Sequence, residues 1–399
     1  MARRTSWLLA TLLMTIVQIS ASYHNSSQAF PVSAPYRHRG FSKRWYGVKP
    51  MKESTPASEQ GAFGPWPHDQ HGLHPLRYCF EDSRSYKTLG PVVEEAVSRW
   101  HGATTADGAS SLSIMPSNRD EPVCNDKDEA DHDALYIKDD TKDESDNDTD
   151  AKHWNTYLCS TQTTVGYNYH SRAIGRNSMK FCELTPGFSR TRAKAALYMM
   201  HELGHAMGLA HEHQRPDRDK HLRFACKNIE GWDEAAMTNT VENDEHEVFG
   251  GPITGKTQGE KDKEIKERKH LVCQTEDAAR VYFPRALEFV RGNYMLNSDE
   301  RWRNYARSTP FDFDSIMIYD SDAQGKKGAT DLTSYEWVIY RRDRNAKQRS
   351  VWMGGRQDGK GGISQGDIAR IAQLYPLTDG GGIKDQNMKE WAEAEESDD

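Results

Sequence analysis

Apolar residues recur along this chain with two periods, which predict short strands and amphipathic helices. Residues 75–80 (PLRYCF) alternate as a half-buried strand does, and residues 85–100 follow with helical spacing. In the second segment the apolar side chains occupy positions i, i+1, i+4, i+5 and i+8 and so share one face: Val92, Val93, Ala96, Val97 and Trp100. This part of the chain therefore predicts a strand followed by a helix that packs on it.

Further elements follow from the same kind of pattern. Residues 134–137 (ALYI) predict a strand embedded in acidic sequence. Residues 164–169 (TVGYNY) and 177–181 (NSMKF) predict two strands separated by polar turn residues. Near the end, Ser364 and the carboxylate three residues later resemble a capping box, and they introduce a helix that Pro376 stops.

A helix is also predicted from Thr191, a suitable N-cap, through a stretch rich in Ala, Leu and Met. It leads into His201-Glu202-Leu203-Gly204-His205, in which the two histidines are four residues apart and share one helix face. Gly208 can adopt a positive φ and end the helix, so the chain can turn back and present His211 from another direction.

The full pattern H-E-x-x-H-x-x-G-x-x-H is a metalloprotease signature. Three imidazoles, from His201, His205 and His211, leave a fourth zinc position open, as in catalytic rather than structural sites. Glu202 can hold a water there and take its proton. The alternative is a buried helix with ordinary histidines, but the fixed spacing of the glycine and the third histidine makes chance unlikely.

Two further motifs accompany this signature. Glu212 directly follows the third histidine (HEHQRPDRD), and residues 315–319 read Ser-Ile-Met-Ile-Tyr. With these features the chain resembles the astacin family of metzincin zinc endopeptidases. The resemblance implies an α+β, zincin-like catalytic domain, with a small mixed twisted sheet, an active-site helix and a cleft between two subdomains.

The resemblance also assigns roles to individual residues. It implies that Met317 lies beneath the zinc, and that Tyr319 ligates zinc at rest and moves onto the reacting carbonyl. It implies that Glu212 helps to anchor the mature N-terminus. Two departures from the family pattern are present: Ile318 replaces the usual histidine of the turn, and the pro-segment motif F-x-G-D is absent.

The N-terminus predicts export. Two arginines precede an apolar run from Trp7 to Ile19 and then small residues, so residues 1–22 have the form of a signal peptide. The run is too short for a comfortable membrane span, and no other stretch reaches its length. We therefore expect a secreted, extracellular protein that is soluble and not held in a membrane.

Six cysteines in an exported chain predict disulfides. The astacin resemblance implies a bond between Cys159 and Cys182. Elimination and proximity then leave two pairs, Cys79 with Cys124 and Cys226 with Cys273. A zinc–thiolate site is the competing interpretation, but no C-x-x-C occurs.

The remaining segments complete the expected organisation. Residues 23–64 predict a pro-segment or linker, with a possible cleavage after Arg44 that would make the protein a zymogen. The metalloprotease domain is expected over residues 65–377, and residues 378–399 form an acidic tail that is expected to be disordered. Asn25 and Asn147 are glycosylation sequons.

Two insertions are expected inside the domain. Residues 119–152 hold 14 acidic and 5 basic residues, which accounts for the net charge of −8 of the whole chain. A solvated loop is favoured over a calcium site, because the EF-hand pattern is absent. Residues 250–270 are Gly-rich and then charged, which predicts a loop or a solvated helix, with a basic docking patch as the alternative.

These observations predict a secreted zinc metalloendopeptidase with one catalytic Zn²⁺, Glu202 as general base and Tyr319 as a second catalytic group. A protein or peptide substrate is expected, with a monomeric chain and no nucleic-acid partner. The alternatives are a catalytically silent, secreted zinc-containing adhesion protein and a metzincin of another subfamily. The first is disfavoured because Glu202 and Tyr319 are both present, and the second because other subfamilies generally lack Glu212 with Tyr319.

Overall fold

A computed structural model describes the following residues: 46–48, 63–105, 110–118, 122–125, 129–141, 161–182, 191–291, 305–307, 311–326, 336–342, 348–356 and 361–377. All of them belong to one unit, Ser42–Asp399. The predicted signal peptide, the Lys43-Arg44 pair, both sequons and the acidic tail lie outside the described residues.

A five-stranded mixed sheet forms the first half of the molecule. Its order is β4 (Leu112–Pro116), β3 (His74–Phe80), β5 (Leu135–Asp139), β8 (Asn177–Phe181) and β6 (Gln162–Thr163). The first four strands are parallel, and β6 pairs antiparallel with β8 at the edge. The strands predicted at 75–80, 134–137 and 177–181 are thus confirmed.

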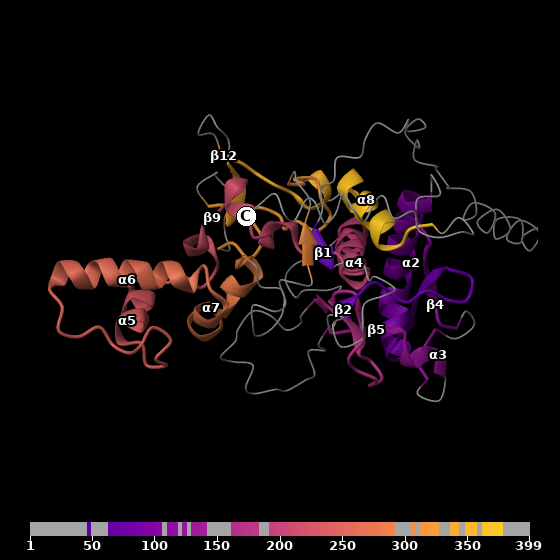
Figure 1. The fold of residues 1–399 in the computed structure, drawn as a ribbon, viewed down its shortest axis with the longest axis horizontal. Coiled ribbons are helices and arrows are strands. Elements are labelled where there is room, and N and C mark those ends of the chain that lie inside the picture. Colours follow the sequence, from indigo (N-terminus) through magenta and orange to yellow (C-terminus); the bar gives the residue numbers. More distant parts are fainter. Residues whose placement is uncertain are drawn as a thin grey trace, which may run out of the picture. The chain divides into compact units, whose positions relative to one another are not determined.

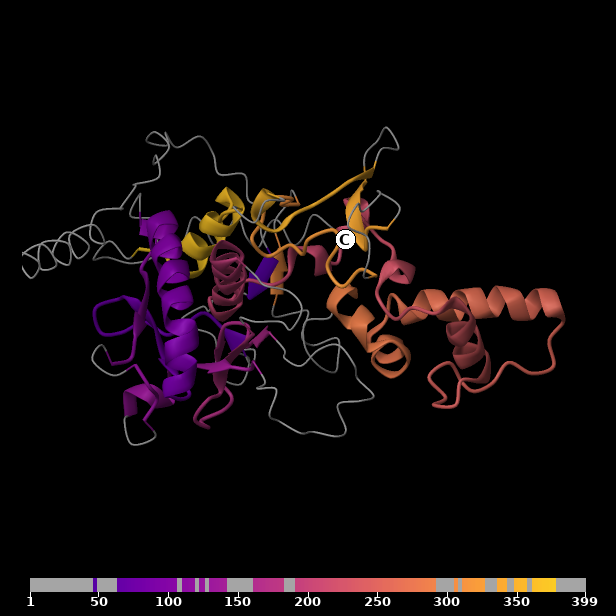
Figure 2. The same ribbon diagram turned by 180° about the vertical axis from the view of Figure 1, so that it is seen from behind.

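Helix α2 (Ser83–Thr105) extends the predicted helix at both ends and lies beside α4 (Arg192–Ala206), as both ribbon views show (Figures 1 and 2). The indole of Trp100 joins them by donating to the Met200 carbonyl at 2.9 Å. The predicted C-terminal helix is α8 (Gln365–Leu374), with Ser364 and Asp367 in the expected capping box. These elements share one hydrophobic core with the sheet.

A second hydrophobic core lies C-terminal to the histidine motif. Its elements are a three-stranded sheet and three helices: β9 (Leu222–Phe224), β11 (Ile339–Arg342), β12 (Gln348–Arg349), α5 (Glu234–Asn243), α6 (Gln258–Val272) and α7 (Glu276–Tyr282). Helix α6 accounts for most of the charged segment 250–270, which is therefore a solvated helix. The α+β class with a mixed sheet is confirmed.

The predicted strand at 164–169 is wrong in extent. Only Tyr167–Asn168 (β7) is a strand, and it pairs with Phe63–Gly64 (β2) instead of following β6 into the large sheet. Gly166, with a φ of 70°, separates the two short strands. A positive φ of this kind interrupts an extended run, so residues 164–166 belong to neither strand, and β6 and β7 on the two sides of them join different sheets.

Strand β1 (Tyr46–Val48) is a short segment that reaches the histidine motif. It pairs with β10 (Tyr305–Arg307), and the Val48 amide donates to the Gly208 carbonyl at 2.9 Å. The side chain of Val48 is buried in the first core. Part of the segment expected to be a linker therefore packs into the first core.

Two predicted disulfides are confirmed, Cys79–Cys124 and Cys226–Cys273. Cys182 is also disulfide-bonded, but Cys159 lies outside the described residues, so its assignment as the partner stays a prediction. Within the part of the chain that the structure describes, no helix is long and apolar enough to cross a bilayer.

Candidate metal centre

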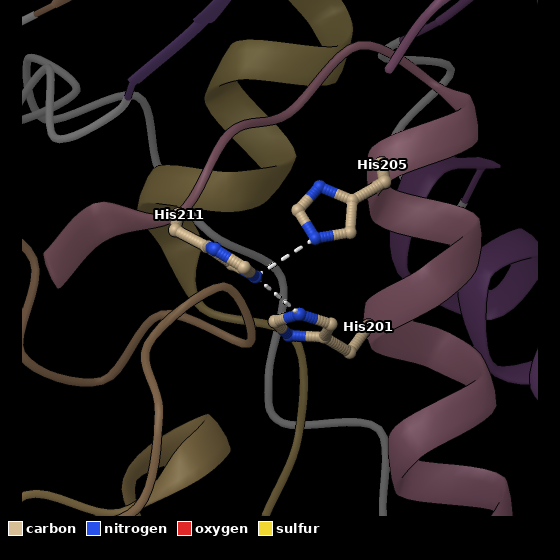
Figure 3. A group of neighbouring side chains, drawn as sticks. All are labelled: His201, His205 and His211. Atoms are coloured by element: carbon tan, nitrogen blue, oxygen red, sulfur yellow. Dashed lines mark hydrogen bonds between the residues drawn. The ribbon is translucent and has the colours of Figure 1, made fainter. Parts of the chain in front are cut away.

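Three histidines converge from two sides. His201 and His205 project from one face of α4, which begins at its N-cap Thr191 as predicted (Figure 3). After the helix, Gly208 adopts a φ of 98°, and the chain returns so that His211 points back at the other two rings. The left-handed conformation is what allows this reversal within three residues.

The three ligand atoms almost meet. The Nε2 atom of His211 lies 3.0 Å from Nε2 of His201 and 3.0 Å from Nε2 of His205. Among the described residues, these three form the group of ligand atoms placed to hold a metal ion, and all three side chains are buried. The spacing that the sequence contains is therefore realised as a compact nitrogen site.

The outer ring nitrogens fix the tautomers. Each Nδ1 faces an oxygen acceptor: the carbonyl of Ile316 for His201 at 2.7 Å, that of Leu209 for His205 at 2.9 Å, and Oε1 of Gln214 for His211 at 2.9 Å. The Nδ1 atoms must carry the protons, so each Nε2 presents a lone pair.

Electrostatics support the same assignment. Burial lowers the pKa of His201 to about 4, and burial also holds the pKa values of His205 and His211 well below the ordinary range. Three neutral imidazoles with facing lone pairs cannot hydrogen-bond to one another through Nε2. A shared cation resolves this repulsion, and the all-nitrogen, three-ligand set fits zinc.

Glu202 is buried one residue after the first histidine on α4. Its Oε2 accepts a hydrogen bond of 2.6 Å from the hydroxyl of Thr163, on the edge strand β6. Sequence reasoning did not identify Thr163, because a single threonine about forty residues away carries no local signal. The contact links the candidate general base to the sheet edge.

The turn at residues 315–319 lies beneath this site. A Cβ atom built on Gly204 would come within 2.5 Å of Met317 Sδ, so the absence of a side chain there makes room for the thioether. Ile316 and Met317 belong to the first core, whereas Ile318 and Tyr319 contact the second. The turn therefore joins the two cores at the histidines.

Tyr319 lies beside the histidine rings, with ring centroids 4.6 Å from His211 and 5.9 Å from His201. Its hydroxyl donates to Oε2 of Glu288 at 3.0 Å. Glu288 lies on the 3-10 helix η5 (Pro284–Phe289) and was not singled out from the sequence. Its pKa is raised by burial, which the Tyr319 hydrogen bond partly offsets.

Glu212 has one partner close in sequence and one far from it. It forms a buried ion pair with Arg215 at 2.8 Å and accepts from the Asp312 amide at 2.8 Å. Burial nevertheless raises the pKa of Glu212 to about 7. The N-terminal anchor implied for this carboxylate stays untested, because Trp45 lies outside the described residues.

Comparisons with known proteins give matches of unequal extent. Residues 190–250 match the sequence model of the Astacin peptidase family. A stretch of 29 residues is 59% identical to the zinc metalloproteinase nas-26 of Caenorhabditis elegans, which is 7% of this chain and 7% of that protein.

Two solved structures are similar at low identity. High choriolytic enzyme 1, a hatching enzyme zinc-protease from the medaka Oryzias latipes, has a TM-score of 0.41 at 16% identity, over 83% of this chain and all of that one. Myroilysin has a TM-score of 0.34 at 16% identity, over 79% of this chain and 96% of that one.

Proposed function

From the resemblance to the astacin family, which the match of residues 190–250 bears out, we propose that this chain is a secreted zinc metalloendopeptidase. The observation that carries the proposal is the convergence of three buried Nε2 atoms beside a buried glutamate. His201, His205 and His211 would hold one zinc ion. When bound, zinc acts as a Lewis acid toward water and the scissile carbonyl.

Glu202 is the proposed general base. Its carboxylate takes a proton from the attacking water and later delivers that proton to the nitrogen of the leaving amine. The hydroxyl of Thr163 holds one carboxylate oxygen in place during this transfer. Tyr319 is proposed as a metal ligand at rest and as the group that donates a hydrogen bond to the oxyanion.

Strand β6 is the proposed substrate-binding edge. It is the terminal strand of the five-stranded sheet, beside β8, and it contacts Glu202 through Thr163. An extended peptide can add to such an edge by backbone hydrogen bonds, which recognise the shape of the peptide more than its side chains. We therefore propose a protein or peptide substrate in extended conformation.

Secretion and activation belong to the same proposal. Disulfides in the described residues are typical of exported proteins, and residues 1–22 have the form of a signal peptide. Cleavage after Arg44 would release the catalytic unit as a monomer. N-terminal sequencing of secreted material tests the cleavage position.

The decisive experiment is digestion of a peptide library by the wild-type protein and by Glu202→Ala, each with and without a chelator. The wild type should cleave and the chelator should stop it. Glu202→Ala should bind one zinc per chain without measurable cleavage. Equal cleavage by the variant would contradict the mechanism, and zinc binding without cleavage by the wild type would favour a silent binding protein.

A further inference from the structure

We propose that Glu288 is a positioning residue for the phenol of Tyr319, which it holds in place for oxyanion stabilisation. The inference rests on the proposed function, because it assigns Glu288 a role only through Tyr319. It adds a residue from a segment outside the matched residues 190–250.

The direct contact is a single hydrogen bond. The Tyr319 hydroxyl donates to Oε2 of Glu288 at 3.0 Å, between residues 31 positions apart. A phenol with a fixed acceptor keeps its ring and its hydroxyl in one orientation. Without that acceptor, the ring would lose part of its orientation.

One imidazole, that of His213, is hydrogen-bonded to the main chain of both Tyr319 and Glu288. The Tyr319 amide donates to Nδ1 of His213 at 3.2 Å, and Nε2 of the same ring donates to the Glu288 carbonyl at 3.0 Å. The rings of His213 and Tyr319 lie 4.4 Å apart, and His213 also stacks on His211 at 4.7 Å. The main chains of donor and acceptor are therefore fixed relative to each other.

The helix that carries Glu288 is tied to the histidine segment at two more points. Gln214, which accepts from His211, donates to the Leu287 carbonyl at 3.2 Å. Arg218, whose side chain is fully buried, donates to the Phe289 carbonyl. Three consecutive carbonyls of η5 are thus bound by the segment that follows the third histidine, so the Glu288 carboxylate is not a loosely placed surface group.

With this arrangement, the proposed role of the phenol requires little reorganisation. No covalent bond changes: the O–H bond stays intact, and the hydroxyl exchanges one acceptor, the Glu288 carboxylate, for another, the oxygen that gains charge. Because the ring is already fixed, little reorganisation is needed when the charge develops.

The test is a set of Glu288 variants in two backgrounds, the wild type and Tyr319→Phe. With a peptide substrate, Glu288→Leu should lower kcat about tenfold and change KM less than about twofold, because a phenol that is no longer held in one orientation presents its hydroxyl less often to the oxygen that gains charge. Glu288→Gln keeps an acceptor oxygen and should retain most of kcat. In the Tyr319→Phe background, Glu288→Leu should lower kcat no further.

Urea unfolding of the chelated protein provides a readout that does not depend on activity. Glu288→Leu should lower the unfolding midpoint in the wild-type background and not in Tyr319→Phe. Glu276→Leu, which removes an ion pair with Arg280 on α7, is the matched control and should leave kcat unchanged.

Several results would overturn the proposal. An equal fall in kcat in both backgrounds would show that Glu288 acts through structure and not through the hydroxyl. An unchanged kcat in Glu288→Leu would remove its role altogether. A wild-type protein that binds zinc and cleaves nothing would instead refute the proposed function, and the unfolding cycle would still report whether the hydrogen bond exists.

Discussion

At the scale of single residues, the contact between Thr163 and Glu202 helps to hold the proposed general base. Both side chains are buried, and the hydroxyl lies 2.6 Å from the carboxylate. We expect Thr163→Val to lower kcat about tenfold with little change in KM, because one charge-assisted hydrogen bond to the base is lost.

Steady-state kinetics with one peptide substrate measures this effect. Thr163→Ser should restore most of the rate, since it keeps the hydroxyl. The neighbouring Thr164, whose hydroxyl accepts from the Ser178 amide, offers the control variant Thr164→Val. A kcat that falls equally in both valine variants would argue against a specific role of Thr163.

Gly204 gives a second prediction at this scale. A methyl group there would meet Met317 Sδ at 2.5 Å, so Gly204→Ala should lower the free energy of unfolding by about 1–3 kcal/mol. Gly259→Ala on α6, where a Cβ meets nothing within 4 Å, should cause no loss. Urea unfolding of both variants provides the measurement; equal stabilities would mean that the turn shifts freely.

The sequence is sufficient to identify the three candidate ligands but not the residues that hydrogen-bond to the site. The motif contains His201, His205 and His211 at fixed local spacing, and the helix period determines how they project. Thr163, Gln214 and Glu288 are absent from any such pattern. Thr163 and Glu288 act through contacts between segments far apart in the chain. Gln214 lies only three residues after His211, but a single glutamine there follows no periodic pattern that would identify it as a hydrogen-bond partner.

At the scale of elements, the N-terminus of α8 is joined to the turn at residues 315–319 by a buried carboxylate. Asp367 accepts from the Ser315 hydroxyl at 2.7 Å and from the Ile316 amide at 2.8 Å. Burial, and then the charge of Asp312, raise the pKa of Asp367 from 3.8 to about 6.

A pH dependence of stability follows. The folded protein binds this proton more tightly than the unfolded chain does, so the contribution of Asp367 is complete below about pH 4. It decreases as the pH rises through about 6, by on the order of 1–3 kcal/mol. Asp367→Asn should flatten this part of the stability curve, measured by urea unfolding between pH 4 and 7.

Ser364→Ala is the control for this prediction, because it removes the hydrogen bond from Ser364 to Asp312 without removing a titrating group. It should lower the stability at every pH and leave the slope as it is. If Asp367→Asn kept the wild-type slope, another group would have to be responsible.

Elements with a complete local signal were predicted well. Helix α4 has a cap, a run of good helix formers and a terminating glycine, and β8 has clean alternation between buried and more exposed positions. The segment 164–169 was misjudged because its division depends on the backbone of Gly166 and on pairing with β2, about a hundred residues earlier. The edge strand β6 was not predicted, because two polar residues, Gln162 and Thr163, carry no period.

At the scale of the whole molecule, two hydrophobic cores meet at the histidines, and the second is closed by Cys226–Cys273. This disulfide encloses α5 and α6 in a loop with a sequence separation of 47. Replacing both cysteines by serine should lower the free energy of unfolding by about 2–4 kcal/mol, because the unfolded chain gains freedom.

Thermal unfolding of the oxidised wild type and of the double variant measures this loss. Zinc stoichiometry at low temperature should be the same in both proteins, because other contacts hold the three candidate ligands. Loss of zinc from the folded variant would mean that the second core determines the position of the third histidine more directly than its hydrogen bonds indicate.

Strand β1 bears on how far exopeptidases could trim the N-terminus of a processed chain. Only Trp45 separates Arg44 from this strand, and the Val48 amide is bound to the carbonyl of Gly208, in the turn that leads to the third histidine. In a chain cut after Arg44, an exopeptidase would reach this strand after removing one residue. Trimming beyond Val48 would remove a backbone partner of that turn, so β1 sets the limit to which a mature terminus can be shortened.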